Sequence, residues 1–171
     1  TLAREWAIAE REKQSIALIF IDVDHFKPYN NTYGHLEGDK VLSQVGKTLK
    51  NMAKRPADLA ARYGGKEFVL LLPNTTIEGA FALAQEVRQA IDDLAIPHKS
   101  SKASKCVSVS IGLSSLVPNG QNTISTLIDN ADEGVYAAKK AGRHRIRVYP
   151  VPEDIAQRKE TMMNNLNIKK S

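Results

Sequence analysis

The stretch from Ser15 to Asp24 constrains the fold more than any other part of the sequence. Residues 16–21 are six consecutive apolar side chains, and Asp22, Val23 and Asp24 follow them directly. An unbroken aliphatic and aromatic run is typical of a strand that is buried on both faces, within a sheet covered by helices. Because side chains alternate along a strand, we expect Asp22 and Asp24 on one face and Val23 on the other. Two carboxylates beside a turn would suit Mg²⁺; a solvated strand end that caps the next helix is the alternative.

A second stretch, residues 60–73, predicts a β-hairpin. Two short apolar runs flank the sequence Gly64-Gly65-Lys66. A glycine pair between strand-like runs favours a tight turn, because glycine adopts a positive φ without a Cβ clash. We expect the turn to place Lys66 and Glu67 beside a sheet edge, where the bare glycine backbone would let a phosphate-bearing ligand approach.

The remaining patterns alternate between helices and strands. We expect helices at residues 1–14, 34–52, 75–94 and 123–140, a turn or short helix at 24–31, and strands at 106–116 and 143–149. Residues 96–104 are predicted to form a loop or an edge strand. Mixed order with a hairpin indicates an α/β fold, with a mixed central β-sheet flanked by helices.

Composition excludes several classes of protein. The chain has 171 residues, 42% hydrophobic and 25% charged, as in an ordinary soluble domain. No stretch approaches the ~20 apolar residues of a membrane span, so we expect no membrane contact. The net charge of +5 favours phosphate-bearing partners but is too diffuse to indicate DNA or RNA binding. The single cysteine, Cys106, fits a buried thiol in a reducing cytoplasm, and the histidines lack the partners of a zinc site.

The domain is predicted to occupy residues 1–150, with a helical or frayed tail at 151–171. The chain starts at Thr1 without a methionine or a signal peptide. We therefore expect an excised domain that continues upstream in a longer protein.

Several blocks of sequence, in matching order and spacing, resemble the GGDEF domain of the diguanylate cyclase family. The matching residues are Asp22-Val23-Asp24-His25-Phe26-Lys27, Asn30, Gly34-His35, Gly38-Asp39, Arg62 to Phe68, Ser110-Ile111-Gly112, Asp132, Tyr136, Ala138-Lys139 and Gly142-Arg143. The family's opening block, Asp-x-Leu-Thr-x-Leu, is missing before Thr1. The resemblance implies a palm-like fold akin to nucleotidyl cyclases. It also implies a homodimer that condenses two GTP molecules into cyclic di-GMP, one GTP held by each half.

The resemblance also implies roles for individual residues, with Mg²⁺ accompanying any bound GTP. The metal ligands would be Asp22, the Val23 carbonyl and Glu67. The guanine would be bound by Asn30 and Asp39. The phosphates would be held by Lys27, Lys139 and Arg143, against the turn of Gly64 and Gly65.

Lys139 and Arg143 can also be considered from their spacing alone. They are four residues apart at a predicted helix end, so they would share one face and could meet a triphosphate. The alternative is a solvated basic C-terminus that the helix dipole favours.

Lys66 is the departure that matters for activity, because the family has Asp or Glu at this position. In the family that carboxylate bridges the metals and helps to activate the attacking 3′-hydroxyl. At ~4 Å and an effective dielectric constant of about 20, an ammonium repels a divalent ion by on the order of 8 kcal/mol. Lysine also offers a metal no lone pair. We therefore expect synthesis at this degenerate catalytic site, Lys66 with Glu67, to fail or to be very slow.

Two outcomes remain open for the altered site. One hard site, with Asp22 and Glu67, could bind Mg²⁺-GTP weakly. Alternatively, the Lys66 ammonium could replace a metal and hold a phosphate directly.

Arg55 and Asp58 match the family's product-binding motif, Arg-x-x-Asp, at the family's offset from Gly64. Arginine suits guanine and phosphate, and a carboxylate can accept hydrogen bonds from guanine. Arg88 on the next predicted helix could add a further arginine, whereas Glu86 would weaken the binding of a bis-phosphate.

These observations favour a cytoplasmic homodimeric module that binds cyclic di-GMP, and GTP as well, without efficient synthesis. An upstream sensor or receiver domain would control it. The alternatives are an active diguanylate cyclase and a dimerisation relay that binds no nucleotide.

Overall fold

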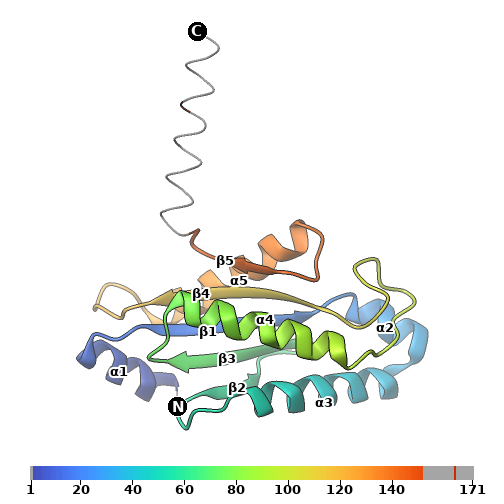
Figure 1. Cartoon of the computed structure of the whole chain (residues 1–171), viewed down its shortest axis with the longest axis horizontal. Helices are drawn as coiled ribbons and strands as arrows, with labels where there is room; N and C mark the ends of the chain where they lie inside the picture. Colours follow the sequence, from blue (N-terminus) through green and yellow to red (C-terminus); the bar gives the residue numbers. More distant parts are fainter. Residues whose placement is uncertain (1, 152–163, 165–171) are drawn as a thin grey trace.

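The computed structural model describes residues 2–151 and 164 and contains one five-stranded sheet of order β2-β3-β1-β4-β5 (Figure 1). Its helices and strands follow the predicted order. They are α1 (Leu2–Glu12), β1 (Ile16–Val23), α2 (Phe26–Tyr33), α3 (His35–Met52), β2 (Leu59–Arg62), β3 (Glu67–Pro73), α4 (Ile77–Asp93), β4 (Val109–Leu116), α5 (Ile124–Lys140) and β5 (Ile146–Val148). The predicted mixed sheet flanked by helices is confirmed.

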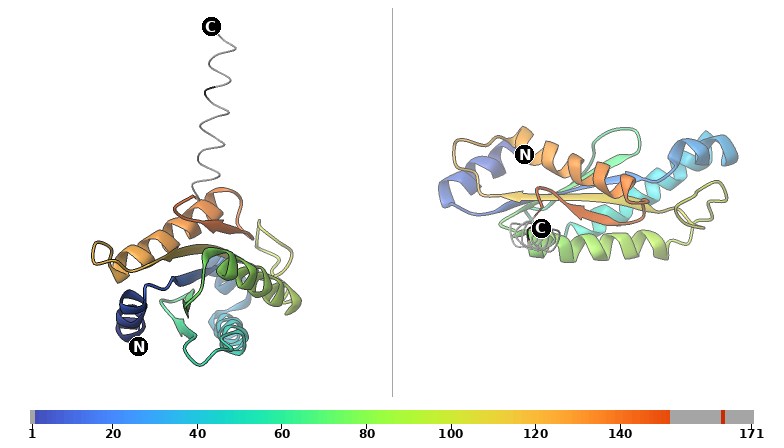
Figure 2. Two further views of the ribbon diagram at one scale, coloured as in Figure 1. Left: turned by 60° about the vertical axis from the view of Figure 1, so that its left-hand side comes forward. Right: turned by 90° about the horizontal axis from the view of Figure 1, so that it is seen from above.

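The first predicted strand, β1, lies in the middle of the sheet, and all of its residues are buried. It pairs in antiparallel fashion with β3 on one side and with β4 on the other, whereas β5 runs parallel to β4. Leu18 and Phe20 pack with α1 and α5, while Ile19 and Ile21 pack with α3 and α4 on the opposite face (Figure 2). Helices on both faces explain why the run carries no polar residue before Asp22.

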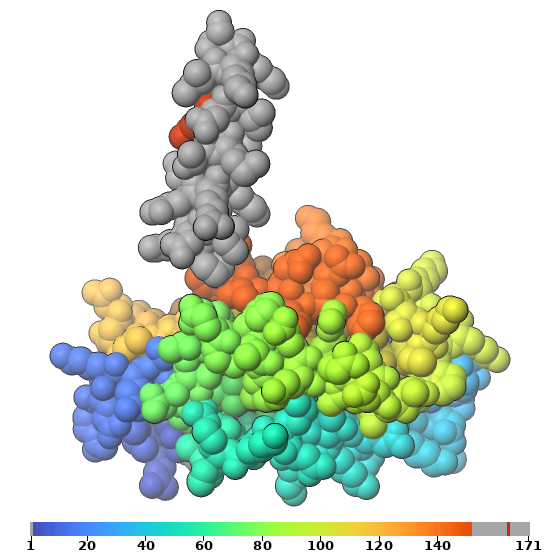
Figure 3. All heavy atoms as spheres, viewed as in Figure 1, coloured from blue at the N-terminus to red at the C-terminus, as the bar shows by residue number. Residues whose placement is uncertain are grey.

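The helices α3 and α4 lie side by side on one face of the sheet. Figure 3 shows α4 between α3 and the segment that contains β5. The Thr76 hydroxyl accepts a hydrogen bond from the N–H of Gly79 and so caps α4 at its N-terminus. The helix therefore begins close to the end of β3 and ends near the loop that precedes β5.

On the other face, α5 lies very close to β4 because two glycines meet there. A Cβ atom at Gly112 would collide with the backbone of α5 at Ala131, and one at Gly134 would lie 2.8 Å from the Cα of Gly112. Thr123 starts the helix with a capping box that includes Thr126. These contacts fix the path of α5, whose last turn carries Lys139.

Three predictions about the second half of the chain need correction or fall outside the structure. The fourth strand begins at Val109, since Cys106 forms only an isolated bridge to Pro97. The last strand is limited to Ile146–Val148, because Arg143 and His144 have left-handed φ angles of 65° and 51°. Of the predicted tail, all but residues 151 and 164 lies outside the described residues. Among the helices described, none is long and apolar enough to cross a membrane.

The glycine contact beneath α5 predicts a large loss of stability for Gly112→Ala. The new methyl group would push against backbone, which cannot rotate away, so we expect the free energy of unfolding to fall by about 1–3 kcal/mol. Urea denaturation followed by circular dichroism measures it. Gly65→Ala is the matched control, because a Cβ there meets no atom within 4 Å. Equal stability of the two variants would contradict the prediction.

Candidate functional site

The predicted site residues gather where β1 ends, at the right-hand end of the sheet in Figure 1. Because β3 is antiparallel to β1, it begins where β1 finishes, and Asp22 is paired with Glu67. The loop from Tyr63 to Lys66 therefore lies beside the end of β1. The helices α2 and α3 follow β1 directly, and the last turn of α5 reaches the same place through Lys139.

Asp22 is the buried centre of this group, with a side chain only 2% exposed. The Nζ of Lys139 lies 2.8 Å from its Oδ2, and the Nζ of Lys66 lies 3.5 Å from its Oδ1. Oδ1 has no hydrogen-bond partner within the described part of the chain. A buried carboxylate is costly unless it is paired, and here two ammonium groups supply the pairing.

Asp24 lies on the same face as Asp22, as predicted, but its environment differs. It accepts hydrogen bonds from the hydroxyls of Ser108 and Ser110, at 2.7 and 2.5 Å, and from the N–H of His144 at 3.1 Å. Its oxygens are therefore occupied by the protein itself. Asp24 joins the end of β1 to β4 and to the loop before β5.

The Gly64-Gly65 turn differs from the predicted tight hairpin. Neither glycine has a left-handed φ. The loop 63–66 is instead held by Arg62, whose guanidinium donates to the carbonyls of Gly64 and Gly65 at distances of 2.6 to 3.1 Å. The strand β3, which begins at Glu67, lies beside the edge strand β2. The open side of Gly65 still gives a ligand close access to the backbone.

The predicted metal ligands do not form a site for a pair of divalent cations. Both oxygens of Asp22 face lysines. The side chain of Glu67 lies against Gly64. In the described ranges, no three His, Cys, Asp or Glu side chains are placed to hold a metal ion. The group therefore does not fit the two-metal arrangement that the family resemblance implies.

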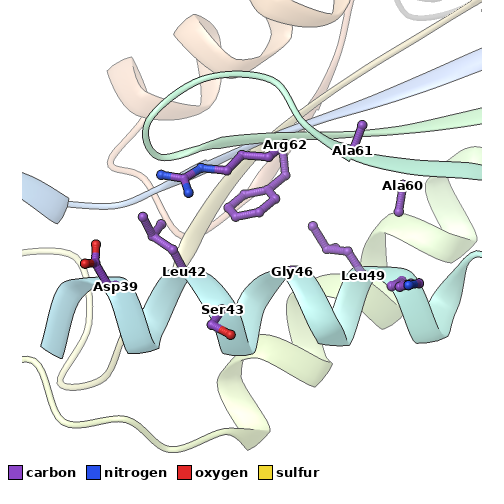
Figure 4. Close-up of a pocket in the computed structure, with 10 residues that line it drawn as sticks. Asp39, Leu42, Ser43, Gly46, Leu49, Ala60, Ala61 and Arg62 are labelled. Carbon is purple, nitrogen blue, oxygen red and sulfur yellow. The ribbon is translucent and has the colours of Figure 1, made fainter. Parts of the chain in front are cut away.

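A cavity of about 570 Å³ lies between α3 and the β2–β3 hairpin. In Figure 4, Asp39 and Leu42 rise from α3 toward the hairpin, and the Arg62 side chain extends over the same end of the cavity. Phe68 and Leu49 contribute apolar walls. An apolar slot with a carboxylate at one end suits a flat base that carries N–H donors.

Asn30 on α2 meets α3 at Gly38, immediately before Asp39. Its Oδ1 is buried and has no hydrogen-bond partner among the described residues. A Cβ at Gly38 would collide with that same atom. The structure thus brings the two predicted guanine-binding residues, Asn30 of α2 and Asp39 of α3, close to the place where these helices meet.

The predicted phosphate-binding residues come from three different elements. Lys27 is exposed in the first turn of α2, and Lys139 is at the end of α5. Arg143 follows the end of α5 in the loop before β5, so the expectation that Lys139 and Arg143 share a helix face is wrong. That loop is held near β1 by the hydrogen bond from the N–H of His144 to Asp24.

Burial, reinforced by the charge of Arg143, lowers the pKa of His25, at the start of α2.

Arg55 and Asp58 form a second group at the other end of β3. The Nη2 of Arg55 lies 2.9 Å from Oδ1 of Asp58, whose side chain is only 5% exposed. Arg55 also donates to the Pro73 carbonyl at 2.8 Å and to the Thr75 hydroxyl at 2.5 Å. This pair lines a cavity of about 390 Å³ together with the first turns of α4.

Arg88 does not join Arg55 and Asp58. Its Nη1 lies 3.5 Å from the carbonyl of His144, near the opposite end of α4. The α4 residues that line the cavity are Thr76, Gly79 and Leu83, and helical spacing continues this face to Glu86. The structure therefore removes Arg88 from the expected product-binding group.

Sequence reasoning missed two buried polar contacts. One is the contact of Asp24 with the hydroxyls of Ser108 and Ser110. The alternation of Val and Ser over residues 107–110 could have indicated a polar partner for these serines. The other is His98, a buried side chain whose Nε2 lies 2.9 Å from the carbonyl of His25. This contact ties the loop after α4 to the start of α2, and no local pattern announces it.

Comparison with known proteins agrees with the geometry. Residues 1–145 match the family model described as diguanylate cyclase, GGDEF domain. Diguanylate cyclase A of Treponema denticola is 38% identical over 135 residues, which are 79% of this chain and 35% of that protein. The chain thus spans about a third of the length of this curated relative.

Two solved structures are also similar. The GGDEF domain of DgcB from Caulobacter crescentus, in complex with c-di-GMP, has a TM-score of 0.77 and 30% identity, covering 86% of this chain and 85% of that one. The active GGEEF domain of a diguanylate cyclase from Vibrio cholerae has a TM-score of 0.73 and 32% identity, covering 87% and 92%. The sequence match and the shared fold agree, and the chain belongs to the GGDEF domain family of cyclic di-GMP signalling.

Proposed function

We propose that this domain is a receptor for cyclic di-GMP that binds the dinucleotide at Arg55 and Asp58 and does not synthesise it efficiently. The observation that carries the proposal is the contact between Lys66 and Asp22. It places a cation where synthesis requires bound metal, while the Arg55–Asp58 group remains complete.

The altered site lacks the means for two-metal chemistry. Such chemistry uses divalent cations to activate the attacking oxygen and to stabilise the leaving group. Lys66 lies within ion-pair distance of the buried carboxylate that would hold them. An ammonium beside phosphates is also a poor base, because it stays protonated.

The Arg55–Asp58 group has the chemistry to bind a guanine dinucleotide. Arg55 orients the Asp58 carboxylate, which can accept hydrogen bonds from the N1–H and N2–H₂ groups of guanine. The N-terminus of α4 lines the same cavity, and its free N–H groups favour a phosphate. The related DgcB domain was solved in complex with c-di-GMP, which supports this ligand for the present chain.

The intact nucleotide cavity supports GTP as a second ligand. The buried Oδ1 of Asn30 has no hydrogen-bond partner among the described residues, and Asp39 borders the cavity, so both groups are available to a guanine. This observation also favours the alternative function, an active cyclase that works as a homodimer. In either case the domain would act in the cytoplasm, under the control of a sensor or receiver domain elsewhere in the protein.

We expect isothermal titration calorimetry to show that the protein binds cyclic di-GMP and that Arg55→Ala weakens binding about 10- to 100-fold. The reason is the loss of charged hydrogen bonds worth about 1.5–3 kcal/mol. Asp58→Asn should weaken binding as well, whereas Arg147→Ala, at an exposed arginine on β5, should have no effect. A wild-type protein that binds no cyclic di-GMP would exclude the receptor function.

We expect no sustained formation of cyclic di-GMP from GTP and Mg²⁺ by the wild-type protein, and at least tenfold more product from Lys66→Glu. The carboxylate would return a metal ligand to the site beside Asp22. Chromatography of the reaction mixture measures the product, and Lys13→Glu, at the opposite end of β1, controls for the change in net charge. Sustained synthesis by the wild type would establish the active cyclase instead.

Gly38→Ala should weaken GTP binding about tenfold without changing the affinity for cyclic di-GMP. The methyl group would displace the Asn30 amide, and the loss of its hydrogen bond to the base would cost about 1–1.5 kcal/mol of binding free energy. Calorimetry with each ligand separates the two effects. Unchanged GTP affinity would show that Asn30 does not contact the base.

A further inference from the structure

We propose that Lys66 and Lys139 together hold the phosphates of a bound nucleoside triphosphate directly, so that this site binds nucleotide without a divalent cation. The inference rests on the proposed function in one respect, that GTP enters the cavity beside Asp39. It is independent of cyclic di-GMP binding at Arg55.

The charge around Asp22 supports this arrangement. The two ammonium groups lie 2.8 and 3.5 Å from the two oxygens of one buried carboxylate. Together they carry the same charge as a single divalent ion, distributed over two atoms. Together with the Asp22 carboxylate they leave a net charge of +1, which still attracts a triphosphate, although the ligand geometry through which a metal activates an oxygen is lost.

The exposure of the three side chains sets the order in which a ligand meets them. The Asp22 side chain is 2% exposed, whereas the Lys66 and Lys139 side chains are 40% and 30% exposed. The carboxylate thus lies behind the ammonium groups. An incoming phosphate would contact the lysines first and would be shielded from the like charge of Asp22.

Lys66 keeps its hydrogen-bonding capacity for a ligand. Its contact with Asp22 is within ion-pair range, but Oδ1 of Asp22 remains without a hydrogen-bond partner among the described residues. An ammonium group has three N–H donors and no acceptor, so Lys66 can donate to phosphate oxygens while it stays close to the carboxylate. The neighbouring Gly65 backbone is open on the ligand side.

The binding of a divalent cation beside Asp22 would be unfavourable. To reach Asp22 it would have to displace two ammonium groups that repel it. Glu67, which is paired with Asp22 across the two strands, has its carboxylate beside Gly64. Magnesium would therefore remain on the free nucleotide and would compete with the lysines for the same phosphate oxygens.

The test is a titration of the whole chain with GTP at constant ionic strength, once with EDTA and once with Mg²⁺. We expect the two Kd values to agree within about threefold, or the EDTA value to be the lower one. Lys66→Ala should weaken binding in EDTA about tenfold or more. Lys66→Glu should bind GTP only with Mg²⁺, and Lys13→Glu should match the wild type.

The proposal is overturned if binding by the wild type disappears in EDTA, if Lys66→Ala leaves the EDTA value unchanged, or if GTP does not bind. Each titration is repeated with cyclic di-GMP. Retained binding at Arg55 shows that a variant is folded, and it separates failure of the metal-free site from failure of the receptor function. Inorganic triphosphate that displaces GTP in EDTA would further support recognition of the phosphates by the lysines.

Discussion

Two buried carboxylates at the end of β1 impose a requirement that the surrounding structure meets. A buried charge without partners costs several kcal/mol, so each carboxylate must be matched. Asp24 is matched by hydroxyls of β4 and by the backbone of the loop before β5. Asp22 is matched by lysines from α5 and from the β2–β3 loop. These contacts hold four separate segments around one point of the sheet.

The pairing of Asp22 also determines which ligands the site can accept. A group of acidic side chains needs a bound cation to be stable, whereas one acid between two lysines already carries a net charge of +1. The two lysines therefore pair Asp22 and leave positive charge that attracts anions. The proposed function attributes the separation of binding from synthesis to a single side chain, Lys66.

Much of the fold could be predicted because it depends on local patterns. The apolar run of β1 and the cap at Thr123 mark elements whose partners are generic apolar surface. The predictions that were wrong concern residues whose positions depend on one particular side chain or helix end. The shape of the Gly64-Gly65 loop depends on the Arg62 side chain, and the position of Arg143 depends on a helix end that spacing alone did not locate. The direction in which the Arg88 side chain points depends on where this residue falls around the axis of α4. A shift of one residue along the helix would decide whether an arginine faces the cavity or the loop before β5.

The way in which Arg62 holds the β2–β3 loop has a wider consequence. The guanidinium binds backbone carbonyls, so the path of the loop does not depend on which side chain stands at position 66. Residue 66 can then be acidic or basic without a change in the main chain around it. A scaffold of this kind holds the backbone of the loop constant while the charge at position 66 changes.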